Sequence, residues 1–563
     1  MNPTITEGSS FLPRAALDRF ADALRRAMSA LYPGSETSAV DFEAPRRPEF
    51  GDFATNAAFA LAKRVRTAPQ AVATALLAEL RKNDAQTCRL FSQLEATAGF
   101  LNLRLAPECW HAALAGMLSD GTQFGSAREN GSRISLEFGS ANPTGPLVVV
   151  QGRTTSIGQT LADIFRFRGY GVFTEWIIND AGAQMETLAR SLFARYRQIF
   201  DSDFPLPAES YPGEYLIPIA QRIESKDGRK WVSLAESEWL PYFTKYGRDG
   251  IVAEQKQVCR RFGVHFDLWQ SEKELHASGK VKETVALLTE KGLTYEQENA
   301  LYFKATQFAD DKDRVIIRSD GRPTYLAQDI AYHYDKLQRS DRVIDILGPD
   351  HHGYIDRLQG IAAALGFPDR LDVLIAQQVT LLHADEVVSM SKRAGAIIPL
   401  DEIIDEVGVD AARFFFIMLA PGSPLKFDVD LAKEQSNDNP VYYVQYGHAR
   451  IASVFRNALP DDVREAATAK TLQNLTHAAE LALIGRLWEL PSLLDNILAQ
   501  FAPHRLAHYA RDVASDFHQF YSECKILTEE RDLRVARLAL CLATRSVLAT
   551  VLRLAGVSAP ETM

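Results

Sequence analysis

The stretch from Glu137 to Pro146, EFGSANPTGP, contains residue types that suit a nucleotide or carboxylate site. It follows a predicted strand, and in parallel sheets ligands bind outside the carboxyl ends of the strands. Its prolines and glycines predict a tight turn, and the helix expected to begin near Gly152 would present free backbone N–H groups to an anion. An ordinary strand-to-helix turn has the same pattern, so the residues alone leave both interpretations open.

Two later segments carry polar groups that could line such a site. Tyr325 and Asp329 follow a turn, DGRP, although a tyrosine and an aspartate at this spacing more often have a structural role. The segment GPDHHGY, residues 348–354, again follows an apolar strand pattern. Adjacent histidines point to opposite sides of the chain and make a poor metal site. We therefore interpret His351 as lining a pocket, and we expect no protein-bound metal.

Near the C-terminus, Tyr446 and Arg450 lie four residues apart in a helical pattern, which puts them on one helical face. Aromatic stacking on bases and arginine contacts to phosphate are how proteins read single-stranded RNA loops. The same two residues could also pack the inside of a helical bundle, and the spacing does not decide between these functions.

Three regions must position these residues. Residues 1–115 combine helical patterns with the apolar segment GFLNLRLA, which predicts a small α+β module. Residues 130–435 alternate strands such as RISLEF, DRVIIRS, RVIDILG and LDVLIAQQV with helices, which predicts a doubly wound, Rossmann-type parallel sheet of the α/β class. A polar, helical stretch at about 187–300 is expected to be an insertion that splits this sheet. Residues 436–563 are helical throughout and predict an all-α bundle.

The composition is that of a globular protein of several domains. The chain has 563 residues, a net charge of −10 and five scattered cysteines that form no CxxC pair, so a disulfide framework or a thiolate zinc site is not expected. The N-terminus has no secretory pattern and no apolar run of about 20 residues occurs, so we expect a cytoplasmic protein with no membrane contact. The acidic charge leaves RNA binding open, because phosphate needs only local basic surface.

The chain resembles the bacterial-type arginyl-tRNA synthetases, a family of class I synthetases. The resemblance rests on EFGSANPTGPL, GYGVFTEWIINDAGAQ, YLAQD, GPDHHGY, SMSKR and GVDAARFFF, and it extends over essentially the whole chain. It implies that Glu137, Tyr325 and Asp329 hold the guanidinium of arginine, with His351 in the same pocket. It also implies that Ser140 and Asn142 contact the other end of the amino acid.

The resemblance further implies where ATP and tRNA bind. ATP, carried with Mg²⁺ on its phosphates, would contact Val148, Gly152, Ser391 and Lys392. Lys392 would neutralise charge as pyrophosphate leaves. The family pattern has two histidines after Leu147, whereas this chain has Val148, Val149, Val150 and Gln151. Gln151 can still donate a hydrogen bond to phosphate, so we group it with Lys392 as catalytic. The expected tRNA contacts are Asn56, Tyr446, Arg450 and Met563.

We therefore expect an arginine–tRNA ligase that forms arginyl-adenylate from ATP and L-arginine and transfers arginine to its tRNA, acting as a monomer. The altered histidine motif leaves an alternative: a paralogue that binds arginine or tRNA without forming adenylate, as a sensor or binding protein. A synthetase for another amino acid is a weaker possibility, because two acidic residues in the pocket suit a guanidinium.

Overall fold

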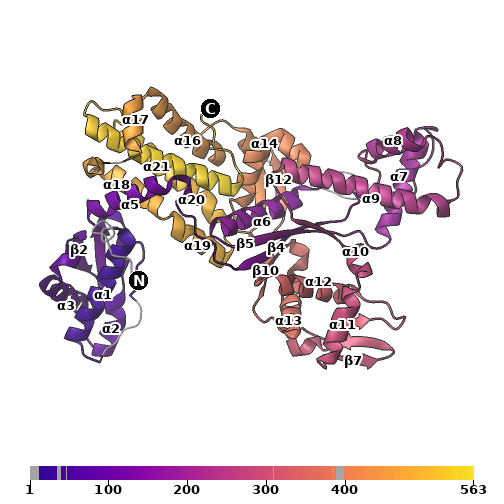
Figure 1. Ribbon diagram of the computed structural model, residues 1–563, viewed down its shortest axis with the longest axis horizontal. Coiled ribbons are helices and arrows are strands. Elements are labelled where there is room, and N and C mark those ends of the chain that lie inside the picture. The colour runs from indigo at the N-terminus through magenta and orange to yellow at the C-terminus, as the bar shows by residue number, and fades with distance from the viewer. Residues whose placement is uncertain are drawn as a thin grey trace.

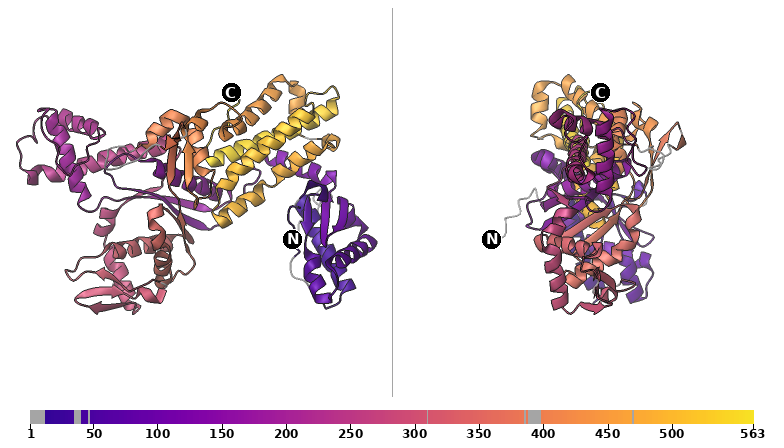
Figure 2. Two further views of the ribbon diagram at one scale, coloured as in Figure 1. Left: turned by 180° about the vertical axis from the view of Figure 1, so that it is seen from behind. Right: turned by 90° about the vertical axis from the view of Figure 1, so that its right-hand side faces the viewer.

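The computed structural model describes residues 12–34, 40–45, 47–308, 310–384, 386–387, 398–468 and 470–563. Figure 1 shows a sheet in the middle of an elongated molecule, with a helical bundle and an N-terminal module on one side and two lobes on the other. Both Figure 1 and the rear view in Figure 2 place the N-terminal module and helices α7 to α9 at opposite ends of the long axis.

The N-terminal module has a three-stranded antiparallel sheet in the order β1-β3-β2, packed against helices. The apolar residues Leu17, Phe20, Leu24 and Met28 recur at helical spacing, and this buried face lets the first helix cover the module core. The elements are α1 (Pro13–Leu31), β1 (Phe53–Thr55), α2 (Ala57–Val65), α3 (Pro69–Asn83), β2 (Phe91–Thr97) and β3 (Phe100–Leu105). α5 (Pro107–Asp120) then leads to the bundle, where the rings of Trp110 and Trp488 meet at 6.3 Å.

The central sheet is parallel and has five strands in the order β11-β10-β4-β5-β6. Its strands are β4 (Arg133–Ala141), β5 (Gly171–Ile178), β6 (Leu268–Ser271), β10 (Arg342–Leu347) and β11 (Leu371–Ile375). The helices α6 (Val149–Phe167), α12 (Tyr325–Arg339) and α13 (Ile355–Leu365) connect or follow these strands. The predicted α/β fold with a doubly wound sheet is therefore confirmed.

Close packing fixes α6 on this sheet. A Cβ atom at Gly158 would lie 2.0 Å from Cγ of Phe138 in β4, and one at Gly139 would lie 2.2 Å from the Trp176 ring in β5. Glycine at these positions lets the helix and the two strands approach one another without an intervening side chain. The strand ends and the helix N-terminus that carry the candidate site are thereby held rigidly together.

The predicted insertion is only partly separate from the sheet. Its first part is the helical lobe α7 (Gln184–Gln198), α8 (Leu216–Asp227) and α9 (Glu236–Arg261), which extends away from the sheet (Figure 1). Within the same range, however, β6 returns to form an edge strand of the parallel sheet beside β5. The short, aromatic segment Leu268–Ser271 lacks the long apolar run of a buried parallel strand, which explains why sequence alone did not identify it.

A second lobe follows β6. It contains α10 (Glu272–Ala277), α11 (Lys280–Glu290), β7 (Thr294–Gln297), β8 (Ala300–Phe303) and β9 (Arg314–Ile317). The segment DRVIIRS was predicted as a strand and forms β9, but it belongs to a separate antiparallel sheet with β7 and β8, not to the parallel sheet. An apolar run identifies a strand without identifying its partners.

The C-terminal region is helical, as predicted. A small sheet of β12 (Val379–His383), β13 (Glu386–Val387) and β14 (Leu425–Asp428), with α14 (Leu400–Ile417) and α15 (Val429–Lys433), precedes it. The bundle contains α16 (Pro440–Asn457), α17 (Pro460–Ala466), α18 (Ala478–Trp488), α19 (Leu490–Gln500), α20 (His504–Glu523) and α21 (Arg531–Ala555). Of the described helices, α21 alone is long and apolar enough to cross a membrane, but most of it is buried inside the bundle.

Candidate active site and RNA-binding surfaces

A cavity of about 310 Å³ opens at the carboxyl ends of β4, β5 and β10, beside α10 and α12. We call it the acidic cavity. Its wall includes five of the six residues predicted to bind the amino acid: Glu137, Ser140, Tyr325, Asp329 and His351. The sixth, Asn142, does not line it. Residues from distant segments thus meet where ligands bind in doubly wound sheets.

Glu137 is 7% exposed, and its Oε2 accepts a 2.7 Å hydrogen bond from Nζ of Lys336. The same ammonium donates to Oδ1 of Asp345 at 2.6 Å, so one buried cation serves two buried carboxylates. Burial raises the pKa of Glu137 to about 7 despite the attraction of Lys336. Burial also acts on Asp345, but Lys336 and His333 outweigh it and hold the pKa of Asp345 below its ordinary value.

Four carboxyl groups line the acidic cavity, and none of the described residues that line it is a lysine or an arginine. Burial raises the pKa values of Asp329 and Glu272, which both line the wall. His333 faces acceptors with both ring nitrogens: Nε2 lies 2.8 Å from Oδ2 of Asp345, and Nδ1 lies 2.7 Å from the backbone oxygen of Asp329. With four carboxyl groups on the wall of the cavity, a cationic ligand would relieve the mutual repulsion of the acids.

Tyr325 and His351 stand at the rim of the acidic cavity. Tyr325 is the first residue of α12 and is 61% exposed, so its ring is accessible to a ligand in the cavity. Thr324 caps this helix by accepting a hydrogen bond from the backbone N–H of Ala327. The cap fixes the N-terminal end of α12 and with it the position of Tyr325. His351 is exposed, and its ring centroid lies 5.7 Å from that of Tyr354.

Asn142 lies in the loop after β4, where its side-chain amide donates to Oε1 of Gln184 at the start of α7. Two residues of the helical lobe hold this loop. Nε2 of Gln255 donates to the carbonyl oxygens of Asn142 and Gly145 at 3.4 and 3.0 Å, and the Tyr215 hydroxyl donates to the carbonyl of Thr144 at 2.5 Å. The helical lobe thus positions the predicted amino-acid loop.

The N-terminus of α6 lies beside this loop. Oε1 of Gln151 accepts a 2.8 Å hydrogen bond from the backbone N–H of Val148, the residue that precedes the helix. Gln151 therefore caps the helix through its oxygen, and its amide nitrogen has no hydrogen bond to any residue in the described ranges. The side-chain geometry is compatible with donation to an anion at the helix N-terminus.

The segment predicted to carry Ser391 and Lys392 lies outside the described residues. The chain after this segment lies against the start of α6. Pro399 forms a β-bridge with Val148, and the N–H of Leu400 donates to the Leu147 carbonyl at 2.8 Å. Gly152 is buried at the same junction, and a Cβ there would lie 2.6 Å from Cδ1 of Leu400. This close contact gives Gly152 a packing role, and its predicted contact with ATP stays a prediction.

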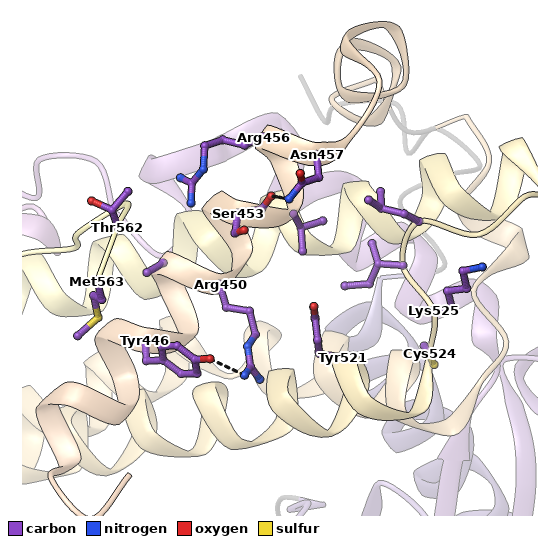
Figure 3. A pocket seen from close by; sticks show the side chains of 14 residues that line it. Tyr446, Arg450, Ser453, Arg456, Asn457, Tyr521, Cys524, Lys525, Thr562 and Met563 are labelled. Atoms are coloured by element: carbon purple, nitrogen blue, oxygen red, sulfur yellow. Dashed lines mark hydrogen bonds between the residues drawn. The ribbon is translucent and has the colours of Figure 1, made fainter. Parts of the chain in front are cut away.

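The bundle contains a second cavity of about 670 Å³, shown in Figure 3, which we call the bundle cavity. The Arg450 guanidinium lies 4.5 Å from the ring centroid of Tyr446 and 4.9 Å from that of Tyr521, and it donates to the Tyr446 hydroxyl at 2.7 Å. Met563 lies at the rim and is 54% exposed. Arg456, Asn457 and Lys525 add polar groups to the wall. An arginine held between two tyrosines offers the cation and the aromatic rings that bind an unstacked base and its phosphate.

Asn56, the remaining predicted RNA contact, is exposed just before α2 in the N-terminal module. Its side chain forms no capping hydrogen bond with the backbone of α2. The neighbouring turn is fixed by Asp52, whose Oδ2 accepts from the Leu105 N–H at 2.8 Å. Gly51 has a φ of 109° and lies too close to Leu103 for any side chain.

Sequence reasoning missed the groups behind the acidic cavity. The network of Lys336, His333 and Asp345 is buried, and Lys336 and His333 are spaced three apart on one face of α12. One signal was present, because Asp345 interrupts the apolar run of β10, and a carboxylate inside a buried strand requires a partner. No signal pointed to Gln255 in α9 or to Tyr215 just before α8, which lie far along the chain from the loop that they hold.

Comparisons with known proteins match three parts of the chain to domains of one family. The family models for the arginyl-tRNA synthetase N-terminal domain, the class I (R) tRNA synthetase catalytic domain and the DALR anticodon-binding domain match residues 18–105, 113–415 and 444–563. The arginine–tRNA ligase of Syntrophotalea carbinolica is 42% identical over 93% of this chain and 95% of the relative. That of Heliobacterium modesticaldum is 41% identical over 97% of this chain and 100% of the relative.

The solved structure of the Thermus thermophilus arginyl-tRNA synthetase has the same fold, with a TM-score of 0.74 at 21% identity over 97% of this chain and 100% of that one. The family models together span nearly the whole chain, and the curated relatives match it over almost their full length. The chain therefore belongs to the arginyl-tRNA synthetase family.

Proposed function

We propose that this protein is an arginine–tRNA ligase, which activates L-arginine with ATP and transfers it to its tRNA. The observation that carries the proposal is the acidic cavity at the carboxyl edge of the parallel sheet, where four carboxyl groups line the wall and none of the described lining residues is a lysine or an arginine. An arginine side chain brings the delocalised charge and multiple donors that such a cavity lacks.

In the proposed complex, Glu137, Asp329 and Tyr325 hold the guanidinium, and His351 closes the rim. Glu137 has a carboxylate oxygen beyond the one bound to Lys336, so it can accept from arginine without losing its buried partner. Ser140 and Asn142 lie toward the loop after β4 and hold the amino and carboxyl end. This direction points the arginine carboxylate toward the N-terminus of α6.

ATP belongs at that helix N-terminus, where the backbone N–H groups and the Gln151 amide attract phosphate. Val148 and Gly152 border this place, and Ser391 and Lys392 belong to the segment that rejoins the described chain beside Val148. Lys392 stabilises the charge that develops as the arginine carboxylate attacks the α-phosphate and pyrophosphate leaves. Mg²⁺ enters with ATP on its phosphates and needs no protein cage.

The tRNA spans three surfaces in this proposal: Asn56 on the N-terminal module, the acidic cavity, and the bundle cavity with Tyr446, Arg450 and Met563. We further propose that the protein acts as a cytoplasmic monomer away from membranes. The deciding experiment is arginine-dependent exchange of pyrophosphate with ATP, measured with and without tRNA. Normal binding of arginine and tRNA without any exchange or charging would instead favour a binding or sensing paralogue, which the valines at 148 and 150 would explain.

Arginine binding should strengthen between pH 6 and pH 8. The pKa of Glu137 is about 7 in the free protein, so this group is mostly neutral at pH 6 and mostly charged at pH 8. A guanidinium favours the carboxylate, so binding at the lower pH must also release a proton, which costs up to about tenfold in affinity per pH unit. Calorimetry at both pH values, in two buffers of different ionisation enthalpy, measures affinity and proton release together. Equal affinities with no proton release would contradict the prediction.

Tyr446→Leu should weaken tRNA binding while leaving arginine binding unchanged. Stacking of one base on an aromatic ring contributes about 1–3 kcal/mol, so the dissociation constant should rise about fivefold or more. Tyr446→Phe is the matched control, because it keeps the ring and removes only the hydroxyl that binds Arg450. Filter binding with tRNA for arginine compares the variants. If the phenylalanine variant lost as much affinity as the leucine variant, the hydroxyl rather than stacking would be responsible.

A further inference from the structure

Two buried residues of the acidic cavity, His333 and Asp345, have no function in the scheme above. His333 belongs to α12 and is 5% exposed, and Asp345 belongs to β10 and is 1% exposed. Nε2 of the imidazole lies 2.8 Å from Oδ2 of the carboxylate. Both residues line the cavity together with Glu137, so the pair lies in the same wall as the group proposed to bind the guanidinium.

The hydrogen bonds of His333 require a proton on each ring nitrogen. Nδ1 lies 2.7 Å from the backbone oxygen of Asp329, which can only accept, and Nε2 faces the carboxylate of Asp345. Burial acts to raise the pKa of Asp345, but Lys336 and His333 outweigh it and lower this pKa to about 2, so the carboxylate accepts as well. An imidazole that donates from both nitrogens is an imidazolium. His333 is therefore a buried cation paired with Asp345.

Asp345 also binds the second cation of this buried layer. Its Oδ1 accepts from Nζ of Lys336 at 2.6 Å, and the same ammonium donates to Oε2 of Glu137 at 2.7 Å. Two carboxylates thus share two cations, and at low dielectric the charge of each group acts strongly on the others. Both oxygens of Asp345 are already bonded, whereas Glu137 keeps its second oxygen for a ligand.

The two members of the His333–Asp345 pair act on Glu137 in opposite directions. Burial raises the pKa of Glu137 to about 7. Against this background Lys336 lowers the pKa of Glu137, Asp345 raises it and His333 lowers it. Removing the imidazolium would therefore favour neutral Glu137, and removing the Asp345 carboxylate would favour charged Glu137.

The other ionisable groups around Glu137 come from β5, α12, α10 and the segment after β10. Glu175 of β5 is its partner in the sheet register, and both oxygens of Glu175 are bonded, one to Arg339 and one to the Tyr332 hydroxyl. Among the described residues, Lys336 alone forms an ion pair with Glu137. The remaining ionisable groups on the cavity wall are Asp329, Glu272, Tyr325, His351 and Tyr354.

We propose that His333 and Asp345 act through Glu137 as specificity-determining residues: they set its charge and thereby select a guanidinium over an uncharged group of the same shape. This inference rests on the proposed function, in which Glu137 binds the arginine side chain. The uncharged counterpart is the ureido group of citrulline, in which an oxygen replaces one terminal nitrogen of the guanidinium. A guanidinium can only donate and needs the carboxylate, whereas the ureido oxygen accepts a hydrogen bond from protonated Glu137.

The test measures binding of arginine and citrulline by calorimetry, at several pH values on both sides of the Glu137 pKa of about 7. His333→Gln keeps a donor toward Asp345 without the charge, and Asp345→Asn keeps an acceptor for His333 without the charge. The double variant replaces the ion pair by two neutral amides that can bond to each other. Ser135→Ala is the control, because Ser135 is buried, bonds to Glu175 and does not line the cavity.

In the wild type, arginine should bind more tightly and citrulline more weakly as the pH rises, so the preference for arginine should increase by up to about tenfold per pH unit. His333→Gln should shift this dependence to higher pH by on the order of one unit and lower the preference at a fixed pH by about tenfold. Asp345→Asn should shift it to lower pH and raise the preference by a similar factor. The double variant should stay close to the wild type because its two charge changes cancel, and Ser135→Ala because it changes no charge.

Shifts in the same direction for the two single variants, or no shift in either, would overturn the inference, because the pair would then affect Glu137 through packing or not at all. A pH dependence in the double variant clearly different from that of the wild type would also overturn it. Near-ultraviolet circular dichroism checks that each variant is folded, and His333→Asn, which keeps a donor toward the Asp329 carbonyl, replaces His333→Gln if that protein does not fold.

These results leave the proposed function intact if the wild type binds arginine and charges tRNA. A wild type that binds no arginine at any of these pH values would reject the proposed function itself, and the inference with it.

Discussion

Glu137→Gln should raise the dissociation constant for arginine about 10- to 150-fold. The substitution preserves shape but replaces a carboxylate by an amide, which removes a hydrogen bond to a charged group worth about 1.5–3 kcal/mol. Lys336 keeps a carboxylate partner in Asp345, so the buried ammonium is not left alone and the protein should still fold. Calorimetry on the purified variant measures the change. The variant should also lose the pH dependence of arginine binding that Glu137 causes.

The matched control is Glu175→Gln. Glu175 pairs with Glu137 in the register of β4 and β5, and it is fully buried, but it does not line the acidic cavity. It bonds to Ser135, Tyr332 and Arg339, so the substitution perturbs the same buried layer without touching the proposed ligand. If both variants lost arginine affinity equally, the effect would come from general disturbance of this layer. Unchanged affinity in Glu137→Gln would remove Glu137 from the pocket.

Local pattern carried much of the fold. The alternation of apolar strands with helices predicted a parallel sheet because neighbouring parallel strands are joined by crossover connections, which are usually helices. The same reasoning could not separate β9 from that sheet. A strand covered by α12 and a strand inside the parallel sheet both need apolar residues, so their sequence patterns look alike. Nor could it find β6, whose four residues are too few to show a period. Strand partners depend on tertiary contacts that local sequence does not encode.

The candidate site likewise contains residues that the sequence patterns predicted and residues that only the structure identifies. Glu137, Ser140, Tyr325, Asp329 and His351 were predicted by motif, and the structure brings them to one cavity. Glu137 and Ser140 lie in the C-terminal half of β4, His351 follows β10, and Tyr325 and Asp329 lie in the first two turns of α12, so the topology alone brings them together. Lys336 and His333 lie within α12, and their importance depends on the carboxylates they meet from two other strands. Only the three-dimensional structure shows that Glu137 and Asp345 share the Lys336 ammonium group as their ion-pair partner.

Restoring one histidine at the start of α6 should speed adenylate formation. In the proposed scheme the phosphates of ATP lie at this helix N-terminus, where valine at 148 offers no donor. A donor aimed at charge that develops in the transition state contributes a few kcal/mol when well placed, so Val148→His should raise pyrophosphate exchange about tenfold or more. Arginine affinity should stay within about twofold, because the substitution touches only the nucleotide side.

The structure favours this single substitution over the triple change Val148→His, Val150→Gly and Gln151→His. Gln151 caps α6 by accepting from the Val148 N–H, and histidine at 151 would remove that cap. Glycine at 150 would add a further cost of about 1 kcal/mol in the first turn of the helix. Both changes would loosen the N-terminus of α6, where phosphate is proposed to bind. The resulting loss of rate would hide any gain from the new donor. Val148→His leaves the cap and the helix as they are.

Val148→Phe distinguishes the effect of a hydrogen-bond donor at position 148 from the effect of a larger side chain there. Phenylalanine fills a similar space beside Pro399 but donates nothing, so exchange should stay at or below the wild-type rate. A gain in both variants would mean that side-chain volume, acting on the chain that rejoins at Pro399, controls the rate. A wild-type rate already so high that neither substitution improves it would mean that another group, with Gln151 the nearest available, already supplies the donor. A gain confined to histidine would show that the missing imidazole limits the reaction in this chain.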